Sequence, residues 1–127
     1  MGDFRKLEVW QKSQQLVASI YRLTSGFPAA ERFGLSSQMR RAAVSVSANI
    51  AEGCGRMGDP ELRRFVRISL GSLSELECEL LLAGTLQLAT QESSSDLLLK
   101  IGSIRGMLQR LHRTLPSSRP NPLDPRP

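Results

Sequence analysis

Residues 95–115 read SDLLLKIGSIRGMLQRLHRTL, and this stretch decides the fold class. Its large apolar residues recur at alternating spacings of four and three: Leu97, Ile101, Ile104, Leu108, Leu111 and Leu115. This spacing keeps one face of an α-helix apolar, whereas a half-buried strand needs an apolar residue at every second position. A helix with such a stripe buries it against other helices. The stretch therefore predicts a helical bundle.

Three stretches before it show the same spacing, separated by short segments rich in Gly, Pro or Ser. We predict helices from about Leu7 to Ser25, from Leu35 to Glu52 and from Asp59 to about Leu86, with glycine-rich residues 53–58 ending the second. Their predicted core stripes are Val9, Leu16, Ile20 and Leu23; Leu35, Met39, Ala42, Val46 and Ile50; and Leu62, Phe65, Val66, Ser69, Leu73, Leu76, Leu80 and Ala83. The prediction is an all-α, up-and-down four-helix bundle.

A chain of 127 residues with 40% hydrophobic residues is expected to form one domain with its own core. We assign residues 1–115 to the bundle. Residues 116–127 contain five of the seven prolines and almost nothing to bury, so they are expected to form a disordered tail.

Several classes of protein are disfavoured by composition. No apolar run approaches the roughly 20 residues of a membrane span, and residues 1–20 lack the apolar block of a secretory signal, so we expect a cytoplasmic protein without a membrane partner. Two cysteines and one histidine cannot supply a zinc cluster. No metal or other cofactor is expected.

The second predicted helix has small apolar residues opposite its core stripe: Val44, Ala48 and Ala51. A helix that is apolar on two faces is buried on both. Because a bundle of four helices offers no partner for the second face, we expect another subunit to cover it, which predicts a homo-oligomer.

The charge balance favours an anionic partner, since 17 Lys+Arg against 12 Asp+Glu give +5 and a pI near 10.0. Arg63, Arg64 and Arg67 are expected together on the outward face of the third helix, with Arg56 just before it. These four arginines are the candidate phosphate contacts. The alternative is a solvated face, or salt bridges to Glu61 and Glu75, with no specific ligand. The aromatic residues are interpreted as core, not as stacking platforms for bases: Trp10, Tyr21, Phe27, Phe33 and Phe65.

Other polar residues are assigned structural roles. Asn49 falls in the core sector of the second helix, where its amide needs partners, and it is expected to pair helix ends or fix subunit register. Arg41 and Glu52 share one flank of that helix and are expected to join interhelical ion pairs that include Glu75 or Glu79.

Catalytic chemistry has little support. Residues 53–58 match G-x-G-x-x-G, but no second strand follows to complete a nucleotide-binding βαβ unit, so a helix terminator is the favoured interpretation. His112 lies among arginines without a carboxylate in register and is expected to face solvent. Cys54, between glycines, is a possible exposed thiol, but a Cys54/His112 dyad has no supporting motif. We predict a non-enzyme with no catalytic residues.

Several of these segments, in order, resemble the 23S rRNA intervening sequence proteins. The similarity covers about residues 4 to 90. Its motifs are Leu7-Glu8-Val9-Trp10, Phe27-Pro28, Glu31-Arg32-Phe33-Gly34-Leu35, residues 38–45, residues 48–53 with Gly55-Arg56, Arg64-Phe65 and residues 71–75. Two positions depart from the family pattern. Ser47 stands where proline is common, which leaves a kink of the second helix open, and Leu86-Gln87-Leu88 leaves the end of the third helix open.

The resemblance implies an up-and-down four-helix bundle that assembles as a ring-like homopentamer. It also implies an RNA context, because some members are encoded within intervening sequences of 23S rRNA genes and relatives are accessory proteins of reverse transcriptases. The predicted function is a noncatalytic oligomeric scaffold that binds structured RNA or an RNA-associated protein through Arg56, Arg63, Arg64 and Arg67. The alternative is a protein-interaction scaffold that makes no contact with nucleic acid.

Overall fold

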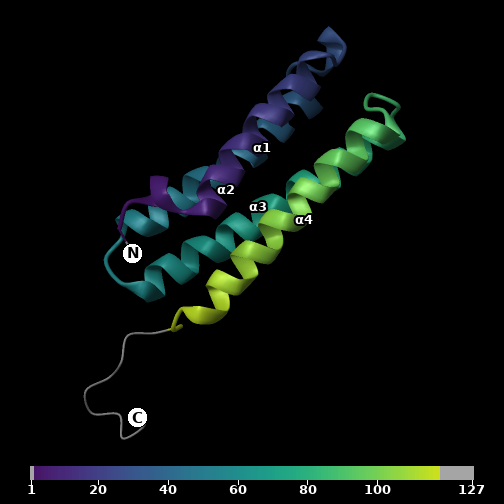
Figure 1. Cartoon of the computed structure of the whole chain (residues 1–127). Helices are drawn as coiled ribbons and strands as arrows, with labels where there is room; N and C mark the ends of the chain where they lie inside the picture. Colours follow the sequence, from purple (N-terminus) through teal and green to yellow (C-terminus); the bar gives the residue numbers. More distant parts are fainter. Residues whose placement is uncertain (1, 118–127) are drawn as a thin grey trace, which may run out of the picture.

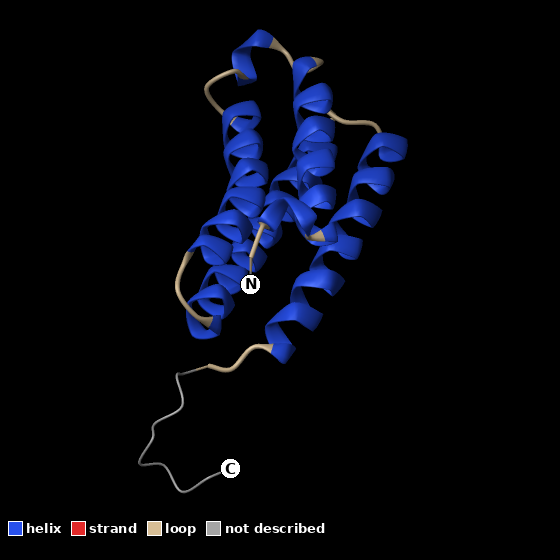
Figure 2. Cartoon of the chain, turned by 60° about the vertical axis from the view of Figure 1, so that its left-hand side comes forward, coloured by secondary structure: helices blue, strands red, loops and turns tan. Residues whose placement is uncertain are grey.

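The computed structural model describes residues 2–117, and every regular element in that range is a helix (Figures 1 and 2). The α-helices are α1 (Glu8–Ser25), α2 (Leu35–Gly55), α3 (Asp59–Thr85) and α4 (Gln91–Thr114). Two short 3-10 helices, η1 (Phe4–Lys6) and η2 (Ala29–Glu31), precede α1 and α2. The all-α prediction is confirmed. The predicted tail, residues 116–127, lies mostly outside the described residues, which end at residue 117.

The helices run alternately up and down, with α1 beside α2 and α3 beside α4, and α2 packs most extensively against α3 (Figure 1). The predicted stripes meet at the centre. The largest fully buried side chains come from all four helices: Leu16, Ile20, Met39, Val46, Ile50, Leu62, Leu73, Leu76, Leu80, Ile101, Ile104 and Leu108. No helix within residues 2–117 is both long and apolar enough to cross a membrane.

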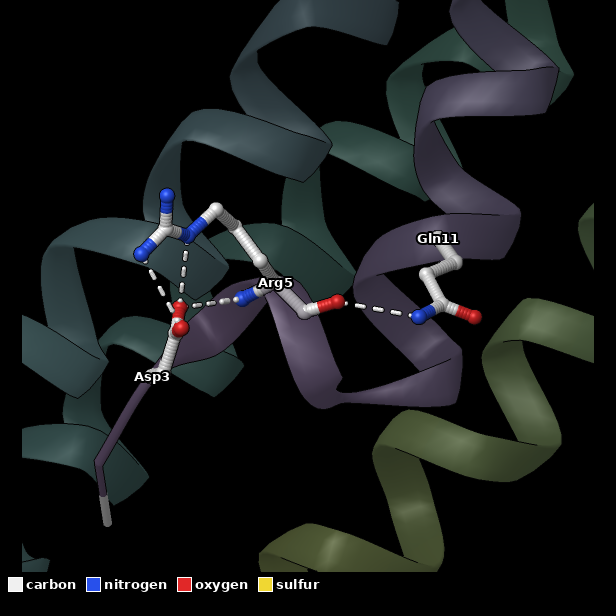
Figure 3. A network of polar contacts seen from close by, with 3 residues as sticks. All are labelled: Asp3, Arg5 and Gln11. Carbon is white, nitrogen blue, oxygen red and sulfur yellow. Dashed lines mark hydrogen bonds and ion pairs between the residues drawn. The ribbon is translucent and has the colours of Figure 1, made fainter.

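The start of the chain is held to the bundle by a small polar network (Figure 3). The Asp3 carboxylate accepts hydrogen bonds from the backbone N–H of Arg5 at 3.0 Å and from its Nε at 2.9 Å. The Arg5 carbonyl accepts from Nε2 of Gln11 at 2.9 Å, which ties η1 to the first turns of α1. Phe4 packs edge-on against Trp10, with ring centroids 5.0 Å apart. The Asp3 carboxylate therefore offsets the positive charge of Arg5.

Helix α2 extends to Gly55, three residues beyond the predicted end, and it is continuous past Ser47. Gly53 lies inside the helix, where it serves close packing. A Cβ at this position would lie 2.9 Å from Cδ1 of Leu62 and 2.9 Å from Cβ of Phe65, closer than carbon atoms approach. The glycine therefore lets α2 and α3 meet tightly at the end of the bundle that carries the candidate arginines.

The remaining boundaries follow local capping. Gly58, with φ of 94°, makes the turn into α3 in a conformation that disfavours side chains. Helix α3 ends at Thr85, one residue before the predicted end, and Gln87 adopts a positive φ of 59° just after it. The predicted start of α4 near Ser95 was wrong. The helix begins at Gln91 because the Oγ1 atom of Thr90 caps it, accepting from the Ser93 N–H at 3.1 Å.

Candidate nucleic-acid interface

The four candidate arginines lie at one end of the bundle, where α2 ends and α3 begins, but they do not form one patch. Their contacts separate them. On a helix, position 67 lies about 40° round from position 63 and position 64 about 60° further in the same direction, so the three positions fall within an arc of about 100°. Arg64 and Arg67 are exposed, as expected for an outward face, whereas Arg63 is half-buried. The structure places Arg64 with Arg56, and Arg63 with Arg67.

The first group is the Phe65 cluster, formed by Phe65, Arg56, Arg64, Glu52 and Glu61. Both guanidinium groups lie against the Phe65 ring, with Cζ atoms 5.2 Å (Arg56) and 5.0 Å (Arg64) from its centroid. Each also has a carboxylate partner. Nη2 of Arg56 lies 2.7 Å from Oε1 of Glu52, and Nη1 of Arg64 lies 3.6 Å from Oε2 of Glu61. The charges of this cluster are balanced locally.

The second group is the His112 cluster, formed by His112 of α4 with Arg63 and Arg67 of α3. Within residues 2–117, neither of these arginines has an ion pair. Nε of Arg63 and Nε2 of His112 are both buried and have no hydrogen-bond partner in the described part of the chain. Arg63 and His112 are half-buried, so the expectation that the imidazole faces solvent was wrong.

The electrostatics of the His112 cluster follow from this arrangement. Burial lowers the pKa of His112 below its usual 6.5, and the charges of Arg63 and Arg67 lower it further. The imidazole is therefore neutral at physiological pH. Arg63 and Arg67 carry two positive charges without a carboxylate partner among the described residues, which leaves the cluster with an uncompensated positive potential.

The second apolar stripe of α2, opposite its core stripe, is largely exposed in the monomer. Val44 retains 42% of its accessible surface, and Ala48 is also exposed, while Ala51 is half-buried. The N-terminal half of this face borders an open hollow of about 620 Å³. Its lining residues are Tyr21, Arg32, Phe33, Ser37, Arg40, Arg41, Val44 and Ser45.

Two aromatic residues at this hollow were wrongly assigned to the core. Phe33 is 87% exposed and Tyr21 is 43% exposed. Arginines lie over both rings, with the Cζ atom of Arg32 5.3 Å from the Phe33 centroid and that of Arg40 4.4 Å from the Tyr21 centroid. Phe33 belongs to the connection between α1 and α2, to which helical periodicity does not apply. Its isolation between Arg32 and Gly34 was the available signal.

The polar residues of α2 make more local contacts than the sequence predicted. The amide of Asn49 is half-buried, and its Nδ2 donates to the carbonyl of Ser45 at 2.8 Å and to its Oγ at 2.9 Å. Ser45 Oγ in turn lies 2.8 Å from Oγ of Ser72 on α3. Asn49 thus reaches α3 only through Ser45. Glu52 pairs with Arg56 of the turn, so the predicted ion pair between Glu52 and α3 was wrong.

Arg41 likewise forms no ion pair with Glu75 or Glu79 within the described residues, contrary to expectation. Glu79 is only 6% exposed, and its Oε1 has no hydrogen-bond partner there. Burial raises the pKa of Glu79 to about 7, and the neighbouring Glu75 adds to this rise while Arg41 opposes it. The carboxyl is therefore about half protonated at neutral pH.

Among the described residues, the candidate thiol is buried and no metal-binding group is formed. Cys54, a possible exposed thiol from sequence, is buried, and burial raises the pKa of its thiol. Residues 2–117 contain no group of three or more His, Cys, Asp or Glu side chains that could hold a metal ion.

The fold matches that of a known protein. A crystal structure from Bacteroides thetaiotaomicron, described as a protein of unknown function from the S23 ribosomal protein family, superimposes with a TM-score of 0.77 at 23% identity. The match covers 83% of this chain and 98% of the other. At this identity the similarity concerns the fold alone. Among curated proteins, none matches the sequence.

The sequence of residues 5–110 matches the family model described as 23S rRNA-intervening sequence protein. This range runs from η1 to the penultimate turn of α4 and includes both arginine clusters except for His112. The chain belongs to the 23S rRNA-intervening sequence protein family.

Proposed function

We propose that the protein is a noncatalytic, cytoplasmic scaffold that binds structured RNA, alone or within an RNA–protein complex, through phosphate contacts at the end of the bundle where α3 begins. One observation carries this proposal: Arg63 and Arg67 lie together without an ion pair among the described residues. Unpaired arginines are available to phosphate oxygens, because binding requires no carboxylate to be displaced.

Arg56 and Arg64 are assigned a secondary part. Each must exchange a glutamate for a phosphate, which reduces the net gain from binding. An RNA context is also what the description of the family names. The noncatalytic character is supported by the cationic surroundings of His112 and the buried Cys54, neither of which suits proton transfer or nucleophilic attack.

The scaffold is proposed to assemble through the outward face of α2, as the ring of five subunits that the family resemblance implies. The exposed Val44 lines the hollow beside Phe33, and the exposed Ala48 lies one turn further along α2. A phenylalanine with 87% of its surface exposed is costly in a monomer, and contact with a second subunit would bury it. Repeating the arginines around a ring would increase their effective concentration for a long RNA.

The RNA-binding proposal is tested by the salt dependence of affinity for a labelled RNA hairpin, measured by fluorescence anisotropy between 50 and 200 mM NaCl. We expect steep weakening with salt and a slope reduced by about 1 for Arg67→Ala. Gln109→Ala, an exposed change on α4, is the control and should leave the slope unchanged. Affinity that does not vary with salt would instead favour the protein-interaction scaffold.

Assembly is tested by light scattering after size exclusion. Val44→Glu should split the oligomer while circular dichroism remains helical, because the residue contributes nothing to the monomer core. Leu99→Glu provides a matched control, since Leu99 is an exposed apolar residue on a different helix. A wild-type monomer in dilute solution would contradict the assembly.

A further inference from the structure

The His112 cluster has a property that the proposed function does not require. Its three side chains come from two helices, and two of its nitrogen atoms, Nε of Arg63 and Nε2 of His112, are buried without a partner in the described residues. Buried polar atoms are almost always hydrogen-bonded. Nε of Arg63 always carries a proton and therefore lacks an acceptor, and Nε2 of His112 lacks one whenever it is protonated. Because the surrounding charge is positive, the fitting acceptor is an anion.

The charges around the imidazole come from identifiable groups. From α3, Arg63 and Arg67 act on it and disfavour its protonated form. On α4 itself, Arg110 and Arg113 are exposed and add to the positive charge of this end. Glu8 begins the antiparallel helix α1, but within residues 2–117 no carboxylate contributes to the pKa shift of His112. Burial and these cations together keep the imidazole neutral, and no carboxylate among the described residues offsets the cations.

We propose that Arg63, Arg67 and His112 form a phosphate-binding site in which the imidazole takes up a proton from solvent as the phosphate binds. This inference rests on the proposed function, since the phosphate in question is that of RNA. Burial and repulsion by the two guanidinium groups both keep the imidazole neutral, and a phosphate between these groups offsets the repulsion. The imidazolium then donates a third charge-assisted hydrogen bond. The site therefore has all of its hydrogen-bond donors only when the imidazole is protonated.

Proton uptake makes binding depend on pH. When a ligand stabilises the protonated form of a single group, its affinity rises as pH falls, by no more than about tenfold per pH unit. The arginines hold their protons throughout this range and give no such dependence. A pH-dependent affinity between pH 6 and 8 therefore isolates the contribution of the imidazole.

The first test uses NMR, because His112 is the one histidine of the chain and its ring signals are unambiguous. The pH titration of the full-length protein is recorded in inorganic phosphate and in NaCl at equal ionic strength. Screening raises the titration midpoint in both. We expect phosphate to raise it further, by about 1 pH unit. Equal midpoints in the two salts would overturn the inference.

Two arginine variants locate the effect. Arg67 is exposed, so Arg67→Gln should fold normally, raise the midpoint in NaCl and reduce the extra rise in phosphate. Arg110→Gln removes an exposed arginine from the same end of α4, and it should preserve the extra rise. Identical behaviour of the two variants would mean that phosphate acts through general charge, which contradicts a site.

The second test separates this inference from the proposed function. Affinity for the RNA hairpin is measured at pH 6, 7 and 8 for wild type and His112→Gln. We expect a pH dependence that His112→Gln abolishes. Salt-dependent binding that is flat with pH would overturn the proton-linked site and leave RNA binding intact. A phosphate-specific NMR effect without any RNA binding would support the site and overturn the proposed function.

Discussion

The Phe65 cluster and the His112 cluster begin with the same residue type on the same helix, yet they differ in charge balance. Arg56 and Arg64 each have a glutamate within 3.6 Å and an aromatic ring to lie on. Arg63 and Arg67 have neither among the described residues, and their charges add to burial in keeping the His112 imidazole neutral. Whether an arginine is available to an anion therefore depends less on its position in a basic stretch than on whether a carboxylate lies close enough to pair with it.

A pair of double variants tests most strongly whether the two clusters differ in RNA binding. Arg63→Ala with Arg67→Ala should weaken RNA hairpin binding by about 10- to 100-fold and lower the salt slope by about 2. Arg56→Ala with Arg64→Ala removes the same charge and should cost less than half of that free energy, because those arginines are already paired. Anisotropy titrations at several salt concentrations measure both. Equal losses would remove the distinction between the clusters.

Gly53→Ala tests the packing beneath the Phe65 cluster. The new Cβ must displace Leu62 or Phe65, so we expect a loss of about 2 kcal/mol in the free energy of unfolding. Gly55→Ala is the matched control, because a Cβ there meets nothing within 4 Å. Chemical denaturation of both variants gives the comparison. A Gly53→Ala protein as stable as wild type would show that α2 and α3 can separate at no cost.

Glu79→Gln extends the comparison to an uncompensated anion. The folded protein raises the pKa of Glu79 to about 7, so its contribution to stability is complete below the unfolded value of 4.5 and is lost as pH rises through 7. At pH 8 we expect the glutamine variant to be more stable than wild type by about 1–2 kcal/mol, and at pH 4 to match it. Denaturant melts across this range measure the difference.

Glu77→Gln serves as the control for this pH dependence. Oε1 of Glu77 lies 3.1 Å from Nη2 of Arg105 on α4, so this change removes a partnered carboxylate. It should not stabilise the protein at pH 8. If both variants behave alike, the effect of Glu79→Gln reports net charge and not burial.

The smallest expected effect comes from releasing one paired arginine. Glu52→Gln leaves Arg56 without its partner, which makes the Phe65 cluster more like the His112 cluster. We expect RNA affinity to rise about two- to threefold, with a change in stability below about 0.5 kcal/mol because the pair is exposed. Salt-dependent anisotropy detects the change. Unaltered affinity would place Arg56 outside the RNA contact.

Local sequence was sufficient for most of the fold and for part of the site. Spacing alone identified the buried stripes, including every predicted core position of α2 and α3. The pairs that neutralise Arg56 and Arg64 also lie within one helical turn, at separations of four and three residues. These two ion pairs can therefore be predicted from the sequence. The expected pairing of Glu52 with α3 overlooked Arg56, which is only four residues away.

Other features could not be predicted because they depend on how separate helices meet. The approach of His112 to Arg63 joins residues 49 apart, and it is set by the register of α4 against α3. The role of Gly53 depends on Leu62 and Phe65 across the helix interface. The exposure of Phe33 depends on the path of a connection that has no periodicity.

The sequence by itself determined which faces of the helices are apolar, since the period of 3.6 residues per turn is a local property of the chain. It also determined that arginines gather where α3 begins. Only the tertiary structure decided which of them are neutralised and which confront another cation. Electrostatic energy depends on distances of a few ångströms between groups on different helices, and those distances arise only when the bundle has packed.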